Sequence, residues 1–434
     1  MTPTRRLPTV ALLFACLCMA ACEAPTSGPR ELDYHPSRVL VRWQAATLDN
    51  QKDDVRTSVG VDTVREYALL PELELLEVTQ RGLGIEDARA QLDRKSAVVA
   101  YAELDYFVRS FGIQDDAHFA RQWSMRNGGG DLGGIPGVPG ADIEAAAGWA
   151  MFTGDPNFVI AVIDTGVQWN HPDLAGNVWQ NHADPIDDVD DDGNGLVDDF
   201  RGWDFVSGDN DPDDPEGHGT HVAGIIGAVG NNATGVAGVN WACKIMPLRI
   251  MGSGRGSISD AIAALEYAVE HGAGISCNSW GDDDRSQALE DAIRAAGARD
   301  HLFVTSAGNR QRDVEAEPVY PAAFDLENIL TVASTDHRDR LASKSNWGAV
   351  SVDLCAPGVH ILSTSNDRTY RVLSGTSMAA AHVAGVAAMV AAHHDIVDPA
   401  EVRQKVLDTV RPVPALAGRT VTGGVVSLRG ALQP

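Results

Sequence analysis

Apolar runs of strand length alternate with helical patterns from Ala141 onward. Strands are expected at Phe158–Ile163, Lys244–Ile250, Ile275–Ser279, His301–Thr305 and Ile329–Ala333, and helices at Ser257–Glu270 and Gln287–Ala296. Strands that alternate with helices form a mostly parallel sheet with helices on both faces. We therefore predict an α/β domain with a doubly wound sheet over residues 113–434. Its functional side chains are expected at the carboxyl ends of the strands.

A smaller unit is predicted over residues 37–112. Two segments have the composition of strands, a third places apolar residues at helical spacing, and a fourth is rich in β-forming and aromatic residues. The two strand-like segments are Val39–Trp43 and Leu73–Val78, the helical segment is Ile85–Lys95, and the segment rich in β-forming and aromatic residues is Val98–Val108. This pattern favours a small α+β domain in front of the larger one.

The first 22 residues resemble an export signal. Arg5 and Arg6 precede the mostly apolar stretch Leu7–Ala21, and Cys22 follows directly. Met19-Ala20-Ala21-Cys22 is similar to a bacterial lipobox, which predicts a lipid on Cys22 and anchoring to a membrane; plain secretion is the alternative. Residues 23–36 are expected to be a linker. The protein is thus predicted to be exported, either as a lipoprotein of the cell envelope, at the outer membrane or surface, or as a secreted protein.

The charge of the chain is concentrated in one stretch. The net charge is −26, and Asp184–Glu216 holds 14 acidic residues and one basic residue, Arg201. Such a density repels itself or binds cations, and it argues against nucleic acid as a partner.

Three cysteines remain beyond the leader: Cys243, Cys277 and Cys355. An odd number cannot pair completely within one chain, so we expect buried free thiols, with one disulfide plus one thiol as the alternative.

Three short motifs contain the residue types of a nucleophilic mechanism. They are Asp164-Thr-Gly, His218-Gly-Thr-His and Gly375-Thr-Ser377-Met. A serine hydroxyl needs an imidazole to take its proton and a carboxylate to orient that imidazole. Asp164 follows an apolar strand, and His218 and Ser377 begin helical patterns, with Gly375 expected to permit the turn before the serine. His221 and His382 are expected to be packing residues.

The order of these motifs resembles that of the subtilases, the subtilisin-like serine proteases of peptidase family S8. The resemblance implies a serine endopeptidase that works through an acyl-enzyme without a catalytic cofactor. It places Asn309 of Ser306-Ala-Gly-Asn309 and the Ser377 amide at the oxyanion. The family usually has proline where this chain has Ala381, for which we expect a local change in helix geometry.

Substrate is expected to bind as an added β-strand between two extended edges. The segments that match these edges are Gly252-Ser253-Gly254, within Gly252–Gly256, and Ser279-Trp280-Gly281. Arg310 matches the rim of the main specificity pocket; a preference for acidic side chains and a merely solvated arginine both remain open.

Structural calcium is expected in the acidic stretch. An EF-hand-like loop offers positions one, three, five, seven and nine but has Arg201 at position twelve. A second set resembles the thermitase-like calcium loop, and Asp173 matches a ligand of the family's commonest site. The candidate ligands are Asp190, Asp192, Asn194, Leu196 and Asp198 for the first loop, with Asp199 as a substitute, and Asp204, Asp209, Asp211 and Asp213 for the second.

The small N-terminal unit resembles the ferredoxin-like, inhibitor-type propeptide of subtilases. This resemblance implies a zymogen that cleaves itself between Arg109 and His118. The predicted partners are peptide or protein substrates and the chain's own propeptide, and the mature enzyme is expected to be a monomer. The alternatives are a catalytically silent, calcium-binding surface protein of the same fold and an esterase that uses the same triad.

Overall fold

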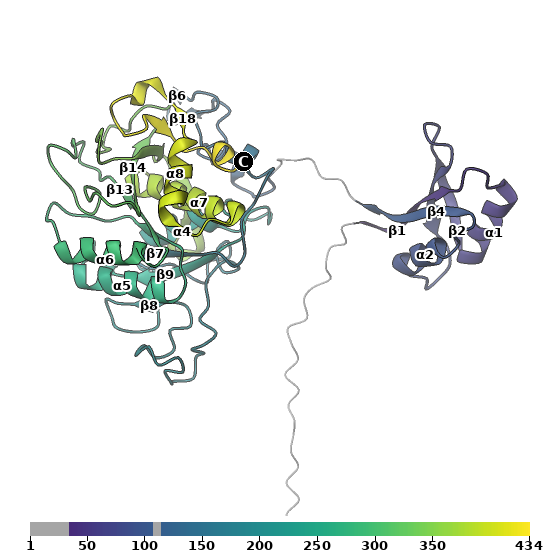
Figure 1. The fold of residues 1–434 in the computed structure, drawn as a ribbon, viewed down its shortest axis with the longest axis horizontal. Coiled ribbons are helices and arrows are strands. Elements are labelled where there is room, and N and C mark those ends of the chain that lie inside the picture. Colours follow the sequence, from purple (N-terminus) through teal and green to yellow (C-terminus); the bar gives the residue numbers. More distant parts are fainter. Residues whose placement is uncertain (1–33, 107–113) are drawn as a thin grey trace, which may run out of the picture. The chain divides into compact units, whose positions relative to one another are not determined.

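The computed structural model describes residues 34–106 and 114–434. The chain divides into two compact units, Met1–Ser110 and Phe111–Pro434, which are drawn in Figure 1. The expected leader, its Cys22 and most of the linker lie outside the described residues, as does the first half of the expected cleavage stretch.

The first unit is a four-stranded antiparallel sheet with two helices. Its strands lie in the order β2-β3-β1-β4. The elements are β1 Tyr34–Trp43, α1 Asp49–Val59, β2 Val61–Glu66, β3 Leu73–Val78, α2 Ile85–Asp93 and β4 Val99–Tyr106. The βαββαβ order and this arrangement of strands are those of a ferredoxin-like fold. Apolar side chains of all four strands and both helices form its own core, in which Trp43, Leu76 and Leu92 are buried.

The second unit is built on a nine-stranded sheet in the order β18-β19-β15-β14-β13-β12-β7-β9-β8. Every pair in it is parallel except β18 with β19. Its strands are β7 Val159–Asp164, β8 Trp203–Asp204, β9 Lys244–Arg249, β12 Ile275–Asn278, β13 Leu302–Ser306, β14 Ile329–Thr335, β15 Leu354–Pro357, β18 Arg411–Pro412 and β19 Gly424–Val425.

Helices cover both faces of this sheet, as Figure 1 shows. One face packs against α4, α7, α8 and α9, and the opposite face packs against α5 and α6. The helices are α3 Ala145–Gly148, α4 His218–Gly227, α5 Ile258–Glu270, α6 Gln287–Gly297, α7 Thr376–His394, α8 Pro399–Asp408 and α9 Leu428–Ala431, with short 3₁₀ turns η1 Phe119–Arg121, η2 Asn366–Arg368 and η3 Pro414–Leu416. The predicted doubly wound α/β architecture is confirmed.

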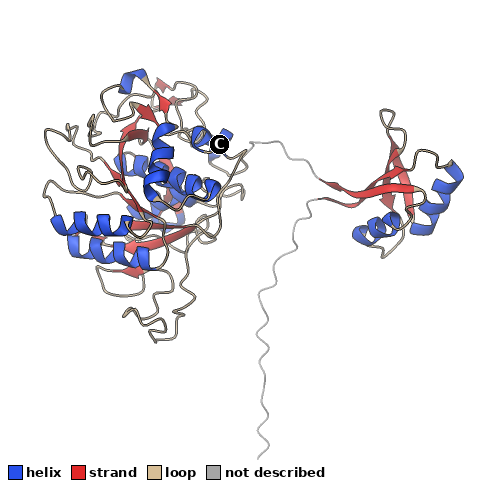
Figure 2. Cartoon of the chain, in the orientation of Figure 1, coloured by secondary structure: helices blue, strands red, loops and turns tan. Residues whose placement is uncertain are grey.

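Small hairpins complete the second unit. They pair β5 Asp131–Leu132 with β6 Ile135–Pro136, β10 Met251–Gly252 with β11 Arg255–Gly256, and β16 Ile361–Ser365 with β17 Thr369–Leu373. Between β7 and α4 the chain contains only the two-residue β8, and Figure 2 shows that segment as loop. This loop is the acidic stretch.

The helix that contains Ser377, α7, is buried over most of its length. Among the described residues, α7 is the one helix long and apolar enough to cross a membrane, but 89% of its apolar window is buried inside the protein. It is therefore the core helix behind the sheet. The helix continues unbroken through the fully buried Ala381. Alanine, unlike proline, keeps the backbone N–H that a helix hydrogen bond requires.

Candidate active site

Asp164 is held at the carboxyl end of a central strand. The run Val-Ile-Ala-Val-Ile lets β7 lie between β12 and β9, buried on both faces. The Asp164 side chain is fully buried, and its Oδ1 accepts hydrogen bonds from Thr165 N and His218 Nδ1, each at 2.7 Å. Its Oδ2 is buried with no partner among the described residues. The carboxylate is thus committed to orienting the imidazole.

His218 is the first residue of α4. The N-cap Gly217 has φ 82°, which favours glycine, and a Cβ there would collide with the guanidinium of Arg371. Because Nδ1–H donates to Asp164, the other ring nitrogen, Nε2, is left as the proton acceptor. Burial acts to lower the pKa of His218, but the charge and hydrogen bond of Asp164, with the charges of Asp214 and Glu216, outweigh it and raise that pKa above its ordinary value.

Ser377 is the second residue of α7. Its Oγ donates to the Ser279 carbonyl oxygen at 3.4 Å, and the Ser279 hydroxyl donates to the Ser377 carbonyl oxygen at 3.2 Å. Among the described residues no hydrogen bond joins Ser377 Oγ to His218. Catalytic hydrogen bonds are often formed only when substrate is bound.

The expected reason for Gly375 was wrong. Its φ of 164° is extended backbone that any residue adopts, so the turn does not require glycine. A Cβ at Gly375 would instead lie 3.4 Å from the Asn309 side chain, which is ordinary contact.

Asn309 is fixed by its oxygen and leaves its nitrogen available. Oδ1 accepts from Thr376 N at 2.9 Å and from the Thr376 hydroxyl at 3.2 Å. The first N–H groups of α7, including that of Ser377, have no partner within the helix. The Asn309 Nδ2 group and the Ser377 amide therefore offer two donors beside the serine hydroxyl.

Each expected substrate edge forms a hydrogen bond with Ser377 or with a residue near His218. Ser279-Trp280-Gly281 follows β12 as an extended segment, and Trp280 Nε1 donates to Ile163 O at 3.0 Å. Gly252-Ser253-Gly254 forms the turn of the β10–β11 hairpin, and Gly254 N donates to Glu216 Oε1 at 3.3 Å. Arg310 forms an ion pair with Asp283 at 2.8 Å, so its charge is partly neutralised at the rim.

His221, His382 and the three thiols are buried, as expected for packing residues. His221 and His382 are fully buried, and burial lowers their pKa values to about 3 and about 4. Cys243, Cys277 and Cys355 are free and buried, which confirms that prediction. Burial raises the pKa of each thiol to about 12.

Two carboxylates of the EF-hand-like set accept hydrogen bonds from the backbone of their own loop. Asp190 accepts from Gly193 N and Gly195 N, and Asp198 accepts from Asp187 N and Asp188 N. These carboxylates thus hold their own loop. Asn194 points its amide nitrogen, not its oxygen, at Asp199, 2.8 Å away.

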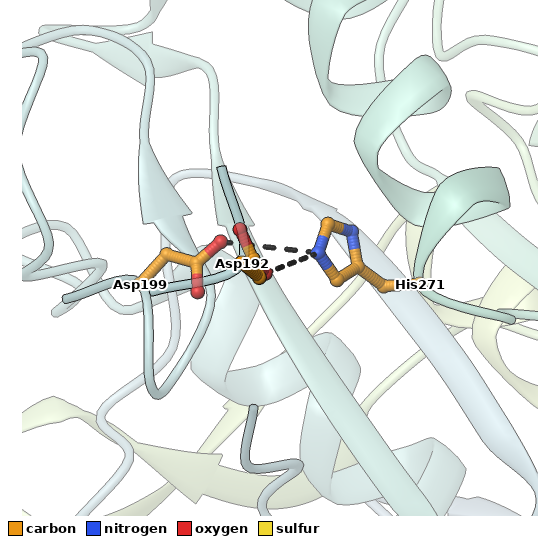
Figure 3. A group of neighbouring side chains, drawn as sticks. All are labelled: Asp192, Asp199 and His271. Carbon is orange, nitrogen blue, oxygen red and sulfur yellow. Dashed lines mark ion pairs between the residues drawn. The ribbon is translucent and has the colours of Figure 1, made fainter. Parts of the chain in front are cut away.

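Asp192 meets two other side chains. Oxygens of Asp192 and Asp199 lie 3.7 and 3.9 Å from His271 Nε2, as drawn in Figure 3. These nitrogen and oxygen atoms lie within 4.8 Å of one another. Among the described residues, no other group of three or more His, Cys, Asp or Glu side chains is so close. Sequence analysis missed His271, because it follows α5 and no local pattern links it to the acidic loop.

In the described residues, the second acidic set does not bring three carboxylate oxygens within 4.8 Å of one another. Asp204 is turned towards Arg249, with which it forms an ion pair, and it accepts from Val206 N and Ser207 N. Asp211 accepts from Trp169 Nε1 at 3.2 Å, and Asp209 accepts from Asp211 N at 3.2 Å. Asp213 keeps one buried oxygen, Oδ1, without a partner among the described residues.

Asp173 is buried near a second carboxylate that sequence analysis missed, Asp116. Asp173 accepts from Asn232 Nδ2 at 2.9 Å and Val236 N at 2.8 Å, and Asp116 accepts from the amides of Asn231 and Asn232. Burial is the main cause that raises both pKa values, and the charge of Asp116 adds to the effect on Asp173. The loop 230–235 thus folds over two buried acids.

A hydrogen-bonded carboxylate and imidazole, together with a serine in the first turn of a helix, are residue types that serine hydrolases use. The family model described as "Subtilase family" matches residues 155–425. The chain is 33% identical over 361 residues to the thermophilic serine proteinase of Bacillus sp. (strain AK1), covering 82% of this chain and 78% of that protein. It is 40% identical over 250 residues to thermitase of Thermoactinomyces vulgaris, covering 57% and 80%.

A solved structure supports the same assignment. A protease from Pseudoalteromonas arctica is similar with a TM-score of 0.58 and 27% identity, covering 74% of this chain and 98% of that one. The chain belongs to the subtilase family, and it is a serine endopeptidase.

Proposed function

We propose that Asp164, His218, Ser377 and Asn309 carry out peptide hydrolysis through an acyl-enzyme. The observation that carries this proposal is the 2.7 Å hydrogen bond between His218 Nδ1 and Asp164 Oδ1, because it leaves Nε2 free to act as the base for Ser377, the second residue of α7. His218 Nε2 takes the Ser377 proton while Oγ bonds to the substrate carbonyl carbon. Asn309 Nδ2 and the Ser377 amide stabilise the negative oxygen.

The second half of the reaction uses the same groups. The carbon–nitrogen bond breaks as His218 returns its proton to the leaving amine. Water then loses a proton to His218 and attacks the acyl carbonyl, and Ser377 is released with its proton restored. Substrate lies as an added strand between Gly252-Ser253-Gly254 and Ser279-Trp280-Gly281.

A cleavage assay tests this proposal. The mature enzyme should cut a mixed peptide library, and Ser377→Ala should lose nearly all of that activity. Ser374, a nearby serine outside the proposed triad, offers a matched control, since Ser374→Ala should keep it. A wild type that cuts no peptide would favour a catalytically silent surface protein.

We further propose that the chain is exported as a precursor. The basic and apolar start of the sequence supports export, and Met19-Ala20-Ala21-Cys22 supports a lipid on Cys22. The ferredoxin-like first unit, with its own core, supports a propeptide that inhibits the enzyme until it is cut. If Cys22 is lipidated, Cys22→Ser should move the protein from the membrane fraction to the medium; unchanged fractionation would contradict anchoring.

We propose that calcium stabilises the second unit. Asp213 has a buried Oδ1 without a partner among the described residues. Asp116 and Asp173 are buried near each other, and no Lys, Arg or His forms an ion pair with them among the described residues. Carboxylate oxygens in such surroundings fit a bound cation. Asp192 and Asp199 offer oxygens in the first loop. His271 would be a neighbour rather than a ligand of calcium, because Ca²⁺ takes oxygen ligands.

A further inference from the structure

One buried carboxylate near the site takes no part in the proposed chemistry. The Asp214 side chain is 2% exposed, and no Lys, Arg or His forms an ion pair with it among the described residues. Five neutral donors surround it instead. Oδ1 accepts from Thr165 Oγ1 at 2.8 Å, Gly217 N at 2.7 Å and Glu216 N at 3.0 Å, and Oδ2 accepts from Thr220 N at 2.8 Å and Thr220 Oγ1 at 2.7 Å.

These hydrogen bonds fix the start of α4. The N-cap residue Gly217 has no side chain that could bond to the free N–H groups of the first turn. Asp214 takes over this task for Gly217 and Thr220, three and six residues further along the chain. Because His218 lies between these two anchored residues, Asp214 sets where its backbone emerges from the loop.

The same carboxylate is tied to the strand that bears Asp164. Thr165, the residue after Asp164, donates its hydroxyl proton to Asp214 and accepts a hydrogen bond from Gly219 N at 2.9 Å. Gly219 is the residue after His218. One hydroxyl therefore joins the neighbours of the two paired residues, and Asp214 orients that hydroxyl. Thr220 adds a second link, since its Oγ1 accepts from Gln168 N at 2.9 Å.

Asp214 also contributes charge. Burial lowers the pKa of His218, and the groups that raise it are Asp164, then Asp214 and Glu216. The other titratable groups on packed elements are His221 on α4, which burial keeps neutral, and Arg371 on β17, which donates to the Glu216 carbonyl oxygen at 2.9 Å.

We infer that Asp214 is a positioning residue of this endopeptidase: it holds His218 in line with Asp164 and places a second negative charge near the imidazole. The inference rests on the proposed roles of Asp164, His218 and Ser377. It concerns kcat and its pH dependence rather than substrate binding, since Asp214 is buried beneath the start of α4.

The test is Asp214→Asn in the full chain, matured as the wild type is. The variant removes the charge and turns an NH₂ group towards donors. We expect kcat to fall on the order of 10- to 100-fold, because small misplacements of a catalytic group cost that much, while KM stays near the wild-type value. The acid midpoint of kcat/KM should move down by about half a pH unit, since losing a nearby negative charge makes the imidazole easier to deprotonate.

The pH midpoint separates positioning with charge from a merely structural role. A fall in kcat with an unchanged midpoint would overturn the electrostatic part, and an unchanged kcat would overturn the positioning part. Thr220→Val serves as a matched control, because it removes one donor to Asp214 and keeps the charge; its midpoint should stay at the wild-type value. A wild type that cuts no peptide would instead overturn the proposed function, on which this inference rests; an active wild type with unchanged kcat in Asp214→Asn would overturn the inference alone.

A second pair of variants applies if Asp214→Asn does not fold. Thr165→Val removes the hydroxyl that joins Asp214 to Gly219, and Thr165→Ser keeps it. We expect the valine variant to lose at least about 10-fold in kcat and the serine variant to retain most of it. Equal kcat values for the two variants would overturn the inference.

Discussion

The hydrogen bond between Asp164 and His218 determines how the imidazole titrates. The surrounding groups together raise the pKa of His218. As the pH falls, the imidazole therefore gains its proton, and stops being a base, at a higher pH than an ordinary histidine does. We predict that kcat/KM falls as pH decreases, with a midpoint above about 6.5. Asp164→Asn should lower both that midpoint and kcat. A wild-type midpoint clearly below that ordinary value would contradict this account.

The buried thiols give a second prediction at single residues. Cys243, Cys277 and Cys355 should be unreactive towards a disulfide reagent in the native protein and should react together on unfolding, because burial hides each sulfur and raises its pKa to about 12. Counting released chromophore before and after denaturant measures this. One fast-reacting thiol in the mature native enzyme would contradict it.

Single residues also show what sequence could predict. Asp164 and His218 follow from motifs that mark a strand end and a helix start, and the structure joins them. Asp214 was missed as an anchor, although aspartate a few residues before a helix start is a capping signal. His271 and Asp116 carry no such local signal, because only the tertiary fold brings them to other acids.

Gly219, the second residue of α4, has no room for a larger side chain. A Cβ on Gly219 would collide with the Gly166 carbonyl oxygen and would lie 3.0 Å from Asp164 Cβ. Gly219→Ala must therefore push α4 away from the strand that bears Asp164. We predict at least about a 10-fold loss of kcat. Gly130→Ala, where nothing lies within 4 Å, should keep wild-type kcat; equal activity of the two variants would contradict the role of this contact.

The acidic loops between β7 and α4 should respond to calcium. A cation that binds only the native state raises apparent stability. We therefore predict that a chelator lowers the melting temperature of the mature enzyme by several degrees and that added Ca²⁺ restores it. Asp213→Asn should reduce this response, whereas Asp204→Asn should affect it less, because Asp204 already pairs with Arg249. An unchanged melting temperature after the chelator is added would contradict calcium binding.

The helices and strands were easier to predict than the contacts that individual side chains make. The strands and helices expected in the second unit lie within a residue or two of the observed ones, for example α5 at Ile258–Glu270 with Ser257 as its N-cap. In the first unit β1 begins at Tyr34, five residues before the expected strand, and α1 and β2 were not predicted with bounds. The EF-hand-like spacing alone does not tell whether a carboxylate faces a cation or the amides of its own loop, so calcium at this loop stays a prediction. Asp190 and Asp198 face amides.

The whole chain consists of two units with separate cores. This organisation supports a precursor that matures by self-cleavage, for which we predict that Ser377→Ala accumulates at full length. Mass spectrometry of the purified variant measures it. Normal processing of the variant, in a host without other secreted proteases, would show that the chain does not cut itself.

The central claim is that Ser377 is the nucleophile activated by His218. Labelling with a fluorophosphonate, followed by peptide mapping, tests it most directly. The account predicts one phosphonylated residue in the mature enzyme, Ser377, and at least about a 100-fold slower reaction in His218→Ala. Peptide cleavage by an enzyme that carries the label on another serine, or that takes up no label, would contradict it.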